Sequence, residues 1–243
     1  MKQLSLVKVP EPPKPHGIDL RCGSIDDLFD EVQDARMVFC DPPWTYSNSG
    51  DKTRSAASHY PCLTMDDIVR HVRRSYDCAA DDAYLVVWAT FPLLAEWMAV
   101  STEDAIRWRY VTGGAWAKTG APGAGFHWRG NAEPILIYRK GKPKPCNTRL
   151  LRSTHVTDQH RGSGNRSGEA LAHSEKPISY QANMIDVWSN PGDLIMDIYA
   201  GLCSVGRACA RTGRKYIGAE IDPKRYRAAV DRLAVDSGLY LGV

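Results

Sequence analysis

The sequence predicts an α/β protein built on one mostly parallel sheet that helices cover on both faces. Seven short segments rich in β-branched and aromatic residues are bounded by turn residues, as buried strands are. Helical stretches separate most of these segments, and this alternation favours a parallel sheet. The length of 243 residues is sufficient for one sizeable core of this class.

Each predicted strand is a short apolar run that ends close to a turn residue. In chain order the strands are Ile18 to Cys22, Met37 to Cys40, Ala83 to Ala89, Tyr110 to Ala117, Pro134 to Arg139, Leu194 to Tyr199 and Lys215 to Ile221. In mostly parallel sheets, ligands bind beyond the carboxyl ends of the strands. The residues that follow these strands are therefore the first candidates for a functional site.

Thr64 is predicted to begin the first long helix, because a threonine hydroxyl can cap the N–H groups of a first turn. Asp66 and Asp67 lie in that turn, and Ile68 and Val72 then follow on one apolar face. The further predicted helices are Leu93 to Val100, Ile178 to Val187, Val205 to Arg211 and Pro223 to Val235.

The chain is predicted to form one domain over residues 17–243, preceded by a proline-rich, extended arm over residues 1–16. Three segments read as irregular: 45–61, 118–130 and 141–174. The last is far longer than an ordinary connection, which indicates a functional segment. The stretch from Arg139 to Arg166, which overlaps this segment, is basic, since it holds eight Lys and Arg residues and only one acid, Asp158. Such a segment suits contact with a phosphate backbone.

The composition excludes several classes of protein. No apolar run approaches the ~20 residues of a membrane span, and residues 1–7 lack the core of a signal peptide. The seven cysteines are odd in number and form no C-x-x-C pair, which indicates free thiols in a reducing compartment. We therefore expect a cytoplasmic protein with no structural zinc site and no other bound metal.

The most informative motif is Asp41-Pro42-Pro43-Trp44, directly after a predicted strand. The Asp41 carboxylate and a backbone carbonyl can accept hydrogen bonds from the exocyclic amine of a flat base. The prolines fix φ near −65° and donate no N–H, so the carbonyls are already oriented. The Trp44 ring offers a stacking surface for a base.

A second motif lies near the end of the sequence. A strand ends at Asp197, a turn containing Gly201 follows, and a helix starts soon after. Such a turn lets a ligand approach the backbone, and a helix N-terminus offers N–H groups to an anion. The next strand ends at Glu220, where a carboxylate can hold both hydroxyls of a ribose. The turn lacks the G-x-G-x-x-G spacing, so a nucleoside ligand other than NAD is favoured.

From about Ile18 to Leu233, the chain resembles the MT-A70 family of adenine-N6 methyltransferases, which use S-adenosylmethionine. The order of the motifs carries the resemblance, with the catalytic motif first and the cofactor motif last. The matching segments are 41–44, His59-Tyr60, 85–88, Trp116-Ala117-Lys118, Trp128 to Glu133, His173 to Pro177, 197–201 and Gly213 to Glu220. The resemblance implies a Rossmann-like, seven-stranded methyltransferase sheet with a circularly permuted motif order.

The resemblance also implies the role of each site residue. Asp41, Pro42, Pro43 and Trp44 would hold the target amine and form the catalytic set. The cofactor would contact Ser24, Ile25, Asp41, Lys176, Asp197, Tyr199, Ala200, Gly201 and Glu220. The nucleic acid would contact Tyr46, His59, Tyr60, Lys118, Trp128, Arg129, Asn131, Glu133, Arg149, Arg152, Arg161 and Arg166.

The expected function is methyl transfer to the N6 amine of adenine in DNA, in a bacterium or the host of a phage. A base inside a duplex cannot reach such a pocket, so the adenine must be flipped out or single-stranded. Three alternatives remain open: the same reaction on RNA, transfer to cytosine N4, and a non-catalytic nucleic-acid-binding partner. One departure concerns Cys203, which stands where related enzymes often have Gly, and a positive φ there would be strained.

Overall fold

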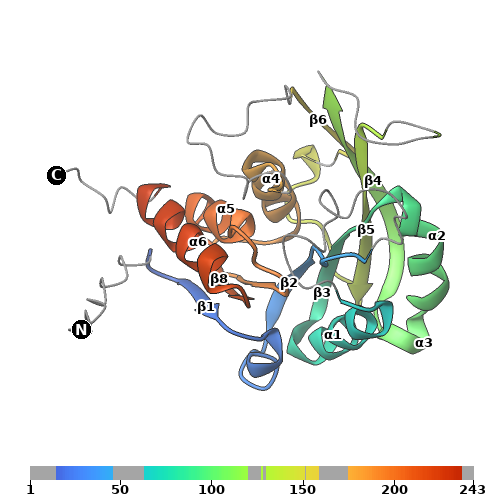
Figure 1. Cartoon of the computed structure of the whole chain (residues 1–243), viewed down its shortest axis with the longest axis horizontal. Helices are drawn as coiled ribbons and strands as arrows, with labels where there is room; N and C mark the ends of the chain where they lie inside the picture. Colours follow the sequence, from blue (N-terminus) through green and yellow to red (C-terminus); the bar gives the residue numbers. More distant parts are fainter. Residues whose placement is uncertain are drawn as a thin grey trace, which may run out of the picture.

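The computed structural model describes residues 15–45, 63–119, 127, 130–150, 152–158 and 175–236. These residues form one eight-stranded sheet in the order β1-β8-β7-β2-β3-β5-β4-β6 (Figure 1). The strands are β1 (Ile18–Cys22), β2 (Ala35–Cys40), β3 (Ala79–Trp88), β4 (Arg109–Thr119), β5 (Ala132–Lys140), β6 (Thr154–Asp158), β7 (Leu194–Asp197) and β8 (Lys215–Glu220). All neighbouring strands run parallel except β5, which is antiparallel to β3 and β4.

Helices cover both faces of the sheet, as the alternation of segments predicted (Figure 1). One face carries α1 (Met65–Cys78), α2 (Phe91–Val100), α3 (Glu103–Ile106) and the 3₁₀ turn η1 (Ile25–Asp27). The other carries α4 (Ile178–Trp188), α5 (Ser204–Thr212) and α6 (Pro223–Asp236). In the described part of the chain, no helix combines the length and apolarity that crossing a bilayer requires.

The start of α1 agrees with its predicted cap. The Thr64 hydroxyl accepts the N–H of Asp67, and the Asp67 carboxylate accepts the N–H of Thr64. This reciprocal pair satisfies two backbone donors that a helix start otherwise leaves without partners. It fixes where α1 begins.

Two apolar cores lie on the two sides of the sheet because side chains alternate along each strand. In β2, Val38 and Cys40 contact the core under α1 to α3, whereas Met37 and Phe39 contact the core under α4 to α6. All four side chains are at most 1% exposed. The central strands are therefore buried on both faces, which is why they read as continuous apolar runs in the sequence.

The eighth strand corrects the prediction of seven strands and of an irregular segment over residues 141–174. Within that segment, β6 pairs in parallel with Ala115–Thr119 of β4, and a 3₁₀ turn, η4 (Thr148–Leu150), precedes it. The only large apolar side chain of β6 is Val156, which is 59% exposed. A strand held by backbone pairing at a sheet edge leaves no apolar pattern in the sequence. In the same way, Lys118 belongs to β4 and not to the predicted loop 118–130.

Candidate active site

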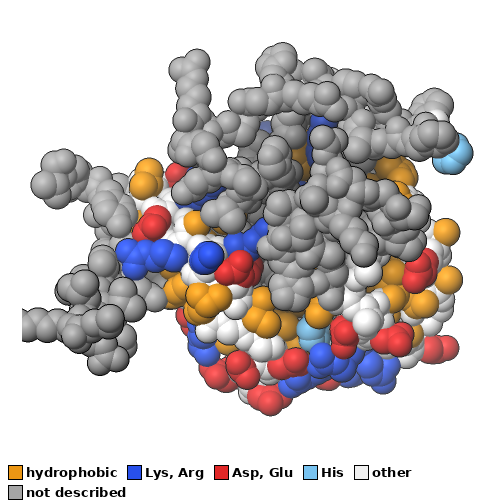
Figure 2. Space-filling model, in the orientation of Figure 1, with side chains coloured by type: hydrophobic (Ala, Val, Ile, Leu, Met, Phe, Trp, Pro, Cys, Tyr) orange, Lys and Arg blue, Asp and Glu red, His pale blue; other side chains and the backbone are white. Residues whose placement is uncertain are grey.

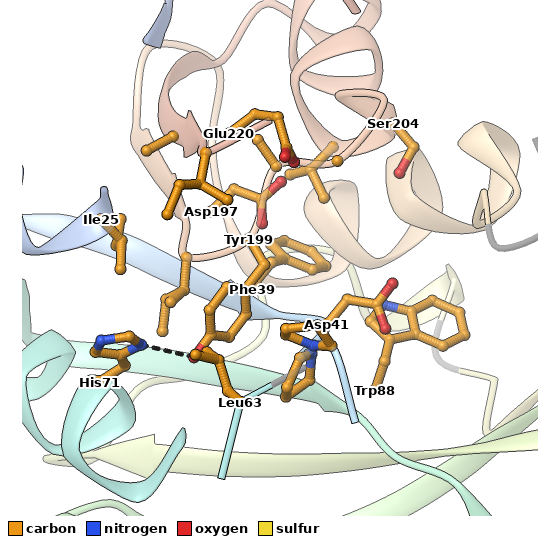
Figure 3. Close-up of a pocket in the computed structure, with 18 of the residues that line it drawn as sticks. Ile25, Phe39, Asp41, Leu63, His71, Trp88, Asp197, Tyr199, Ser204 and Glu220 are labelled. Atoms are coloured by element: carbon orange, nitrogen blue, oxygen red, sulfur yellow. Dashed lines mark hydrogen bonds between the residues drawn. The ribbon is translucent and has the colours of Figure 1, made fainter. Parts of the chain in front are cut away.

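A cavity of about 430 Å³ opens at the carboxyl ends of the parallel strands. Asp41 follows β2, Asp197 ends β7 and Glu220 ends β8, and all three carboxylates line the cavity. Figure 3 shows Asp197 and Glu220 on one side, Asp41 on another, and Ile25 at the opposite end from Asp41. Two motifs more than 150 residues apart in sequence thus meet in one site.

The tetrapeptide 41–44 is held rigidly. The N–H of Trp44 donates to the carbonyl of Pro42 at 2.8 Å, and the N–H of Leu63 donates to the carbonyl of Pro43 at 3.2 Å. The Trp44 indole donates to the carbonyl of Trp88 at 3.3 Å and packs edge-on against Trp97. Trp44 is only 6% exposed, although it lines the cavity.

A short chain of alternating charges leads away from Asp41. The Lys176 ammonium donates to Asp41 Oδ2 at 2.7 Å and lies 3.3 Å from Glu133 Oε2. Lys118 donates to the other oxygen of Glu133. Burial raises the pKa of Asp41, although Lys176 opposes this effect. Burial acts in the same direction on Glu133, but there the two lysines outweigh it and lower the pKa.

The turn after β7 has the geometry that the sequence motif predicted. Gly201 has a φ of 53°, and Cys203 has a φ of 62°, so a non-glycine residue occupies the left-handed region immediately before α5. Among the described residues, no side chain caps the start of α5, and Ser204, its first residue, lines the cavity. The start of a helix is a common binding site for an anionic group.

Two carboxylates on this side of the cavity are deeply buried. Asp197 is 3% exposed and accepts the Tyr216 hydroxyl at 3.3 Å. Burial, together with the nearby Asp41 charge, raises the pKa of Asp197 to about 7. Glu220 is 9% exposed and accepts the N–H of Asp222 at 2.9 Å, and burial raises its pKa as well.

Several polar groups around the cavity have no partner within the described part of the chain. These are Trp88 Nε1, Thr90 Oγ1 and Gln181 Oε1, and all three residues line the cavity. Buried polar atoms are rarely left without a hydrogen bond, because each costs about 1–3 kcal/mol. Their arrangement fits a ligand that supplies both donors and acceptors.

The cavity brings together every residue proposed from sequence for the amine and the cofactor. These are Ser24, Ile25, Asp41, Pro42, Pro43, Trp44, Lys176, Asp197, Tyr199, Ala200, Gly201 and Glu220. Glu133, which was proposed for the nucleic acid, lines it as well. Lys118 does not line it but bonds Glu133. Asn131, Arg149 and Arg152 are exposed and lie outside the lining. Tyr46, His59, Tyr60, Trp128, Arg129, Arg161 and Arg166 fall outside the described residues.

Sequence reasoning missed part of the lining. The additional residues include Asp26, Phe39, Arg70, His71, Trp88, Thr90, Gln181, Ser204 and Arg225. Trp88 lies near the end of the predicted strand Ala83 to Ala89 and Thr90 directly follows it, and these positions could have identified them. His71 lies three residues after Ile68 on the apolar face of α1, so the helical spacing predicts its burial but not its contact with the cavity.

The surface near α1 is not a basic patch. Acidic and basic side chains alternate along this edge (Figure 2), and they form ion pairs such as Arg70–Asp26 and Arg74–Asp30. Paired charges of both signs produce little net field at a distance. A polyanion would therefore find no dominant attraction along this edge.

Comparisons with known proteins identify similar sequences and similar folds. The DNA adenine methyltransferase YhdJ of Escherichia coli (strain K12) is 28% identical over 116 residues, which cover 44% of this chain and 36% of YhdJ. The crystal structure of the M1.HpyAVI–SAM complex superposes with a TM-score of 0.65 at 14% identity, over 89% of this chain and 99% of that one. The PvuII cytosine-N4-specific DNA methyltransferase gives 0.68 at 12% identity, over 94% and 95%.

The two structures establish the fold, since their sequence identity is low. The family assignment comes from a family model described as DNA methylase, which matches residues 35–231. That range runs from the start of β2 to within α6, and it contains both sequence motifs. The chain belongs to the DNA methylase family.

Proposed function

We propose that this protein transfers a methyl group to the N6 amine of adenine in DNA, as a member of the MT-A70 branch. S-adenosylmethionine is the cofactor. The observation that carries the proposal is the meeting of the Asp41 tetrapeptide and the Asp197–Gly201 turn in one cavity. An amine held by the first motif would lie beside a methyl donor held by the second.

Different residues around the cavity would contact different parts of the cofactor. Asp197, the turn through Gly201 and the start of α5 would contact the amino-acid end. Glu220, at the end of the adjacent strand, would hold the ribose hydroxyls. Ser24 and Ile25, which follow β1, would border the adenine ring. The bound sulfonium supplies an activated methyl group, so the protein has to align the acceptor rather than activate the donor.

Asp41 is placed to act on the acceptor amine. The lone pair of an exocyclic amine is delocalised into the ring, so acceptors that strengthen as charge builds on nitrogen favour the transition state. A carboxylate is too weak a base to deprotonate the neutral amine beforehand. Asp41 would therefore take the proton once methylation has made the nitrogen acidic. The Pro42 carbonyl already accepts the Trp44 N–H, so its second lone pair would serve the amine.

Lys176 has a different contact from the one that sequence reasoning emphasised. Its ammonium bonds Asp41 Oδ2 and Glu133, which supports a role in orienting the Asp41 carboxylate and keeping it ionised. We retain contact with the cofactor carboxylate as a second role, because Lys176 also lines the cavity.

The remaining part of the proposal concerns contact with the DNA. A flipped or single-stranded adenine would enter the cavity beside Trp44. Arg149 and Arg152, exposed near β6, would contact phosphates, which position the strand without specifying its sequence. RNA is a further substrate class with the same target amine. A purely binding role is disfavoured because Asp41, Lys176, Asp197 and Glu220 are all retained.

Cytosine N4 is the second candidate acceptor, favoured by the structural likeness to the PvuII enzyme. Asp41 argues against cytosine as the acceptor, because cytosine enzymes more often begin this motif with Ser. The two reactions leave different products, N6-methyladenine and N4-methylcytosine. Mass spectrometry of nucleosides from DNA treated with the purified protein would therefore separate them directly.

The test of the catalytic assignment is Asp41→Ala, assayed by tritium transfer from labelled S-adenosylmethionine to unmethylated DNA. We expect the variant to lose methyl transfer but to bind S-adenosylhomocysteine within a few-fold of wild type. Asp104→Ala, an exposed acid in α3, is the control and should retain full activity. Normal turnover by Asp41→Ala would refute the assignment.

A further inference from the structure

A histidine from α1 contacts the cofactor turn at one specific atom. His71 Nδ1 lies 2.7 Å from the Tyr199 hydroxyl, and the two ring centroids are 5.8 Å apart. Figure 3 shows the Tyr199 ring extending from the turn after β7 toward His71, with this hydrogen bond at its tip. Both residues line the cavity. His71 Nε2 contacts the Arg70 guanidinium, which can only donate, so a neutral imidazole carries its proton on Nδ1 and donates it to the Tyr199 hydroxyl.

The surroundings of His71 fix its orientation. The side chain is 6% exposed. Its other nitrogen, Nε2, lies 2.9 Å from the Arg70 guanidinium and 3.5 Å from Asp26 Oδ2. Its ring also packs against Phe29. Burial, with the nearby Arg70 charge, lowers the pKa of His71, so the ring is neutral at physiological pH. An imidazole held on both sides presents Nδ1 to Tyr199 in one direction.

The same helix is tied to the acceptor half of the site. Directly before α1, the Leu63 N–H donates to the Pro43 carbonyl, and the Thr45 hydroxyl donates to the Leu63 carbonyl at 2.8 Å. His71 lies two turns further along α1. The helix therefore connects the catalytic tetrapeptide with the turn proposed to hold the cofactor.

The Tyr199 hydroxyl needs a hydrogen-bond partner, whereas a phenylalanine at this position would need none. In an open cavity, water can bond a hydroxyl on the wall. Once a ligand fills the cavity, that water is displaced, and a hydroxyl without a protein partner is left buried at a cost that appears on binding. His71 provides this hydrogen bond from outside the volume that the ligand would occupy.

We propose that His71 is a positioning residue for cofactor binding, acting through its hydrogen bond to the Tyr199 hydroxyl. This inference rests on the proposed role of the Tyr199–Gly201 turn as part of the cofactor site. His71 holds the Tyr199 ring as a fixed wall of the cavity and keeps its hydroxyl satisfied when the ligand is bound. It does not touch the reacting atoms.

The test is a double-mutant cycle on the affinity for S-adenosylhomocysteine, measured by calorimetry. His71→Leu should weaken binding about tenfold in the wild-type background, because it leaves the hydroxyl without its partner. In the Tyr199→Phe background, the same substitution should change affinity less than twofold, since no hydroxyl remains. Ser75→Ala removes a buried hydrogen bond elsewhere on α1 and should leave affinity unchanged.

A purely structural role would give a different pattern. If His71 only packs, His71→Leu weakens binding equally with Tyr and with Phe at position 199, and the proposal fails. His71→Asn gives an independent measure if the leucine variant does not fold, because an amide on the shorter side chain can bond the hydroxyl. It should bind within threefold of wild type, and a larger loss contradicts the proposal. No binding by the wild type would instead overturn the cofactor site itself.

Discussion

Asp197 is predicted to lower the stability of the protein at neutral pH, and Asp197→Asn should therefore raise it. The carboxylate is 3% exposed, and its pKa of about 7 stands well above its ordinary value of 3.8. A difference of roughly three between these pKa values corresponds to about 4 kcal/mol between the two protonation states. Asparagine has nearly the same shape and can still accept the Tyr216 hydroxyl.

The pH dependence has a definite sign. Because the pKa of Asp197 is higher in the folded than in the unfolded protein, the folded state holds this proton more tightly. Between pH 4 and 7, its contribution to the free energy of unfolding falls as pH rises, since the folded state must give up a proton that the unfolded state has already lost. Above pH 7 the full free-energy cost of burying the ionised Asp197 carboxylate is present, and below pH 4 this cost vanishes.

The assay is urea unfolding of wild type and Asp197→Asn at pH 4.5, 6 and 8. We expect the variant to be more stable by about 2–4 kcal/mol at pH 8, with a much smaller difference at pH 4.5. Asp104→Asn, at an exposed carboxylate, is the control and should show no comparable trend. This expectation is refuted if the variant is more stable than wild type by less than about 1 kcal/mol at pH 8, or by the same amount at pH 4.5 and pH 8. Either result would show that burying the ionised Asp197 carboxylate does not destabilise the fold.

Two further substitutions test the charges around the cavity. Lys176→Met leaves Asp41 and Glu133 without their shared ammonium and should lower the free energy of urea unfolding by about 3 kcal/mol. Its control, Lys224→Met at an exposed position in α6, should change that free energy by less than about 0.5 kcal/mol. Equal effects of the two substitutions would contradict the buried ion-pair network. Glu220→Ala should weaken S-adenosylhomocysteine binding at least tenfold by calorimetry, while Glu103→Ala in α3 should not, and an unchanged affinity for Glu220→Ala would count against the ribose contact.

The elements that sequence predicted well are those that bury apolar surface. Seven strands and five helices were located to within a few residues, because their apolar residues recur with the period of the structure. The prediction failed where backbone pairing, not burial, holds the chain. Strand β6 has an exposed Val156, and the start of β3 carries exposed Asp81 and Asp82. Neither produces a pattern that separates a strand from a loop.

In the site as well, some features were predictable from the sequence and others were not. Asp41, Asp197 and Glu220 were predictable because each follows an apolar strand, and parallel topology brings strand ends together. The contact between His71 and Tyr199 was not, because it joins a helix and a turn 128 residues apart in the chain through side chains alone. The pairing of Lys176 with Asp41 was missed for a similar reason. Sequence position shows that both are in the site but not which group each one bonds.

The order of the strands has a consequence for synthesis of the protein. Strand β1 leaves the ribosome first, yet within the described sheet it pairs only with β8, nearly 200 residues later. Strand β7, which separates β8 from β2, also emerges late. In a nascent chain, the edge of β2 that pairs with β7 therefore stays unpaired until β7, which ends at Asp197, has been translated. Contacts of such long separation form slowly, so this protein should depend on chaperones during translation more than one whose central strands come first.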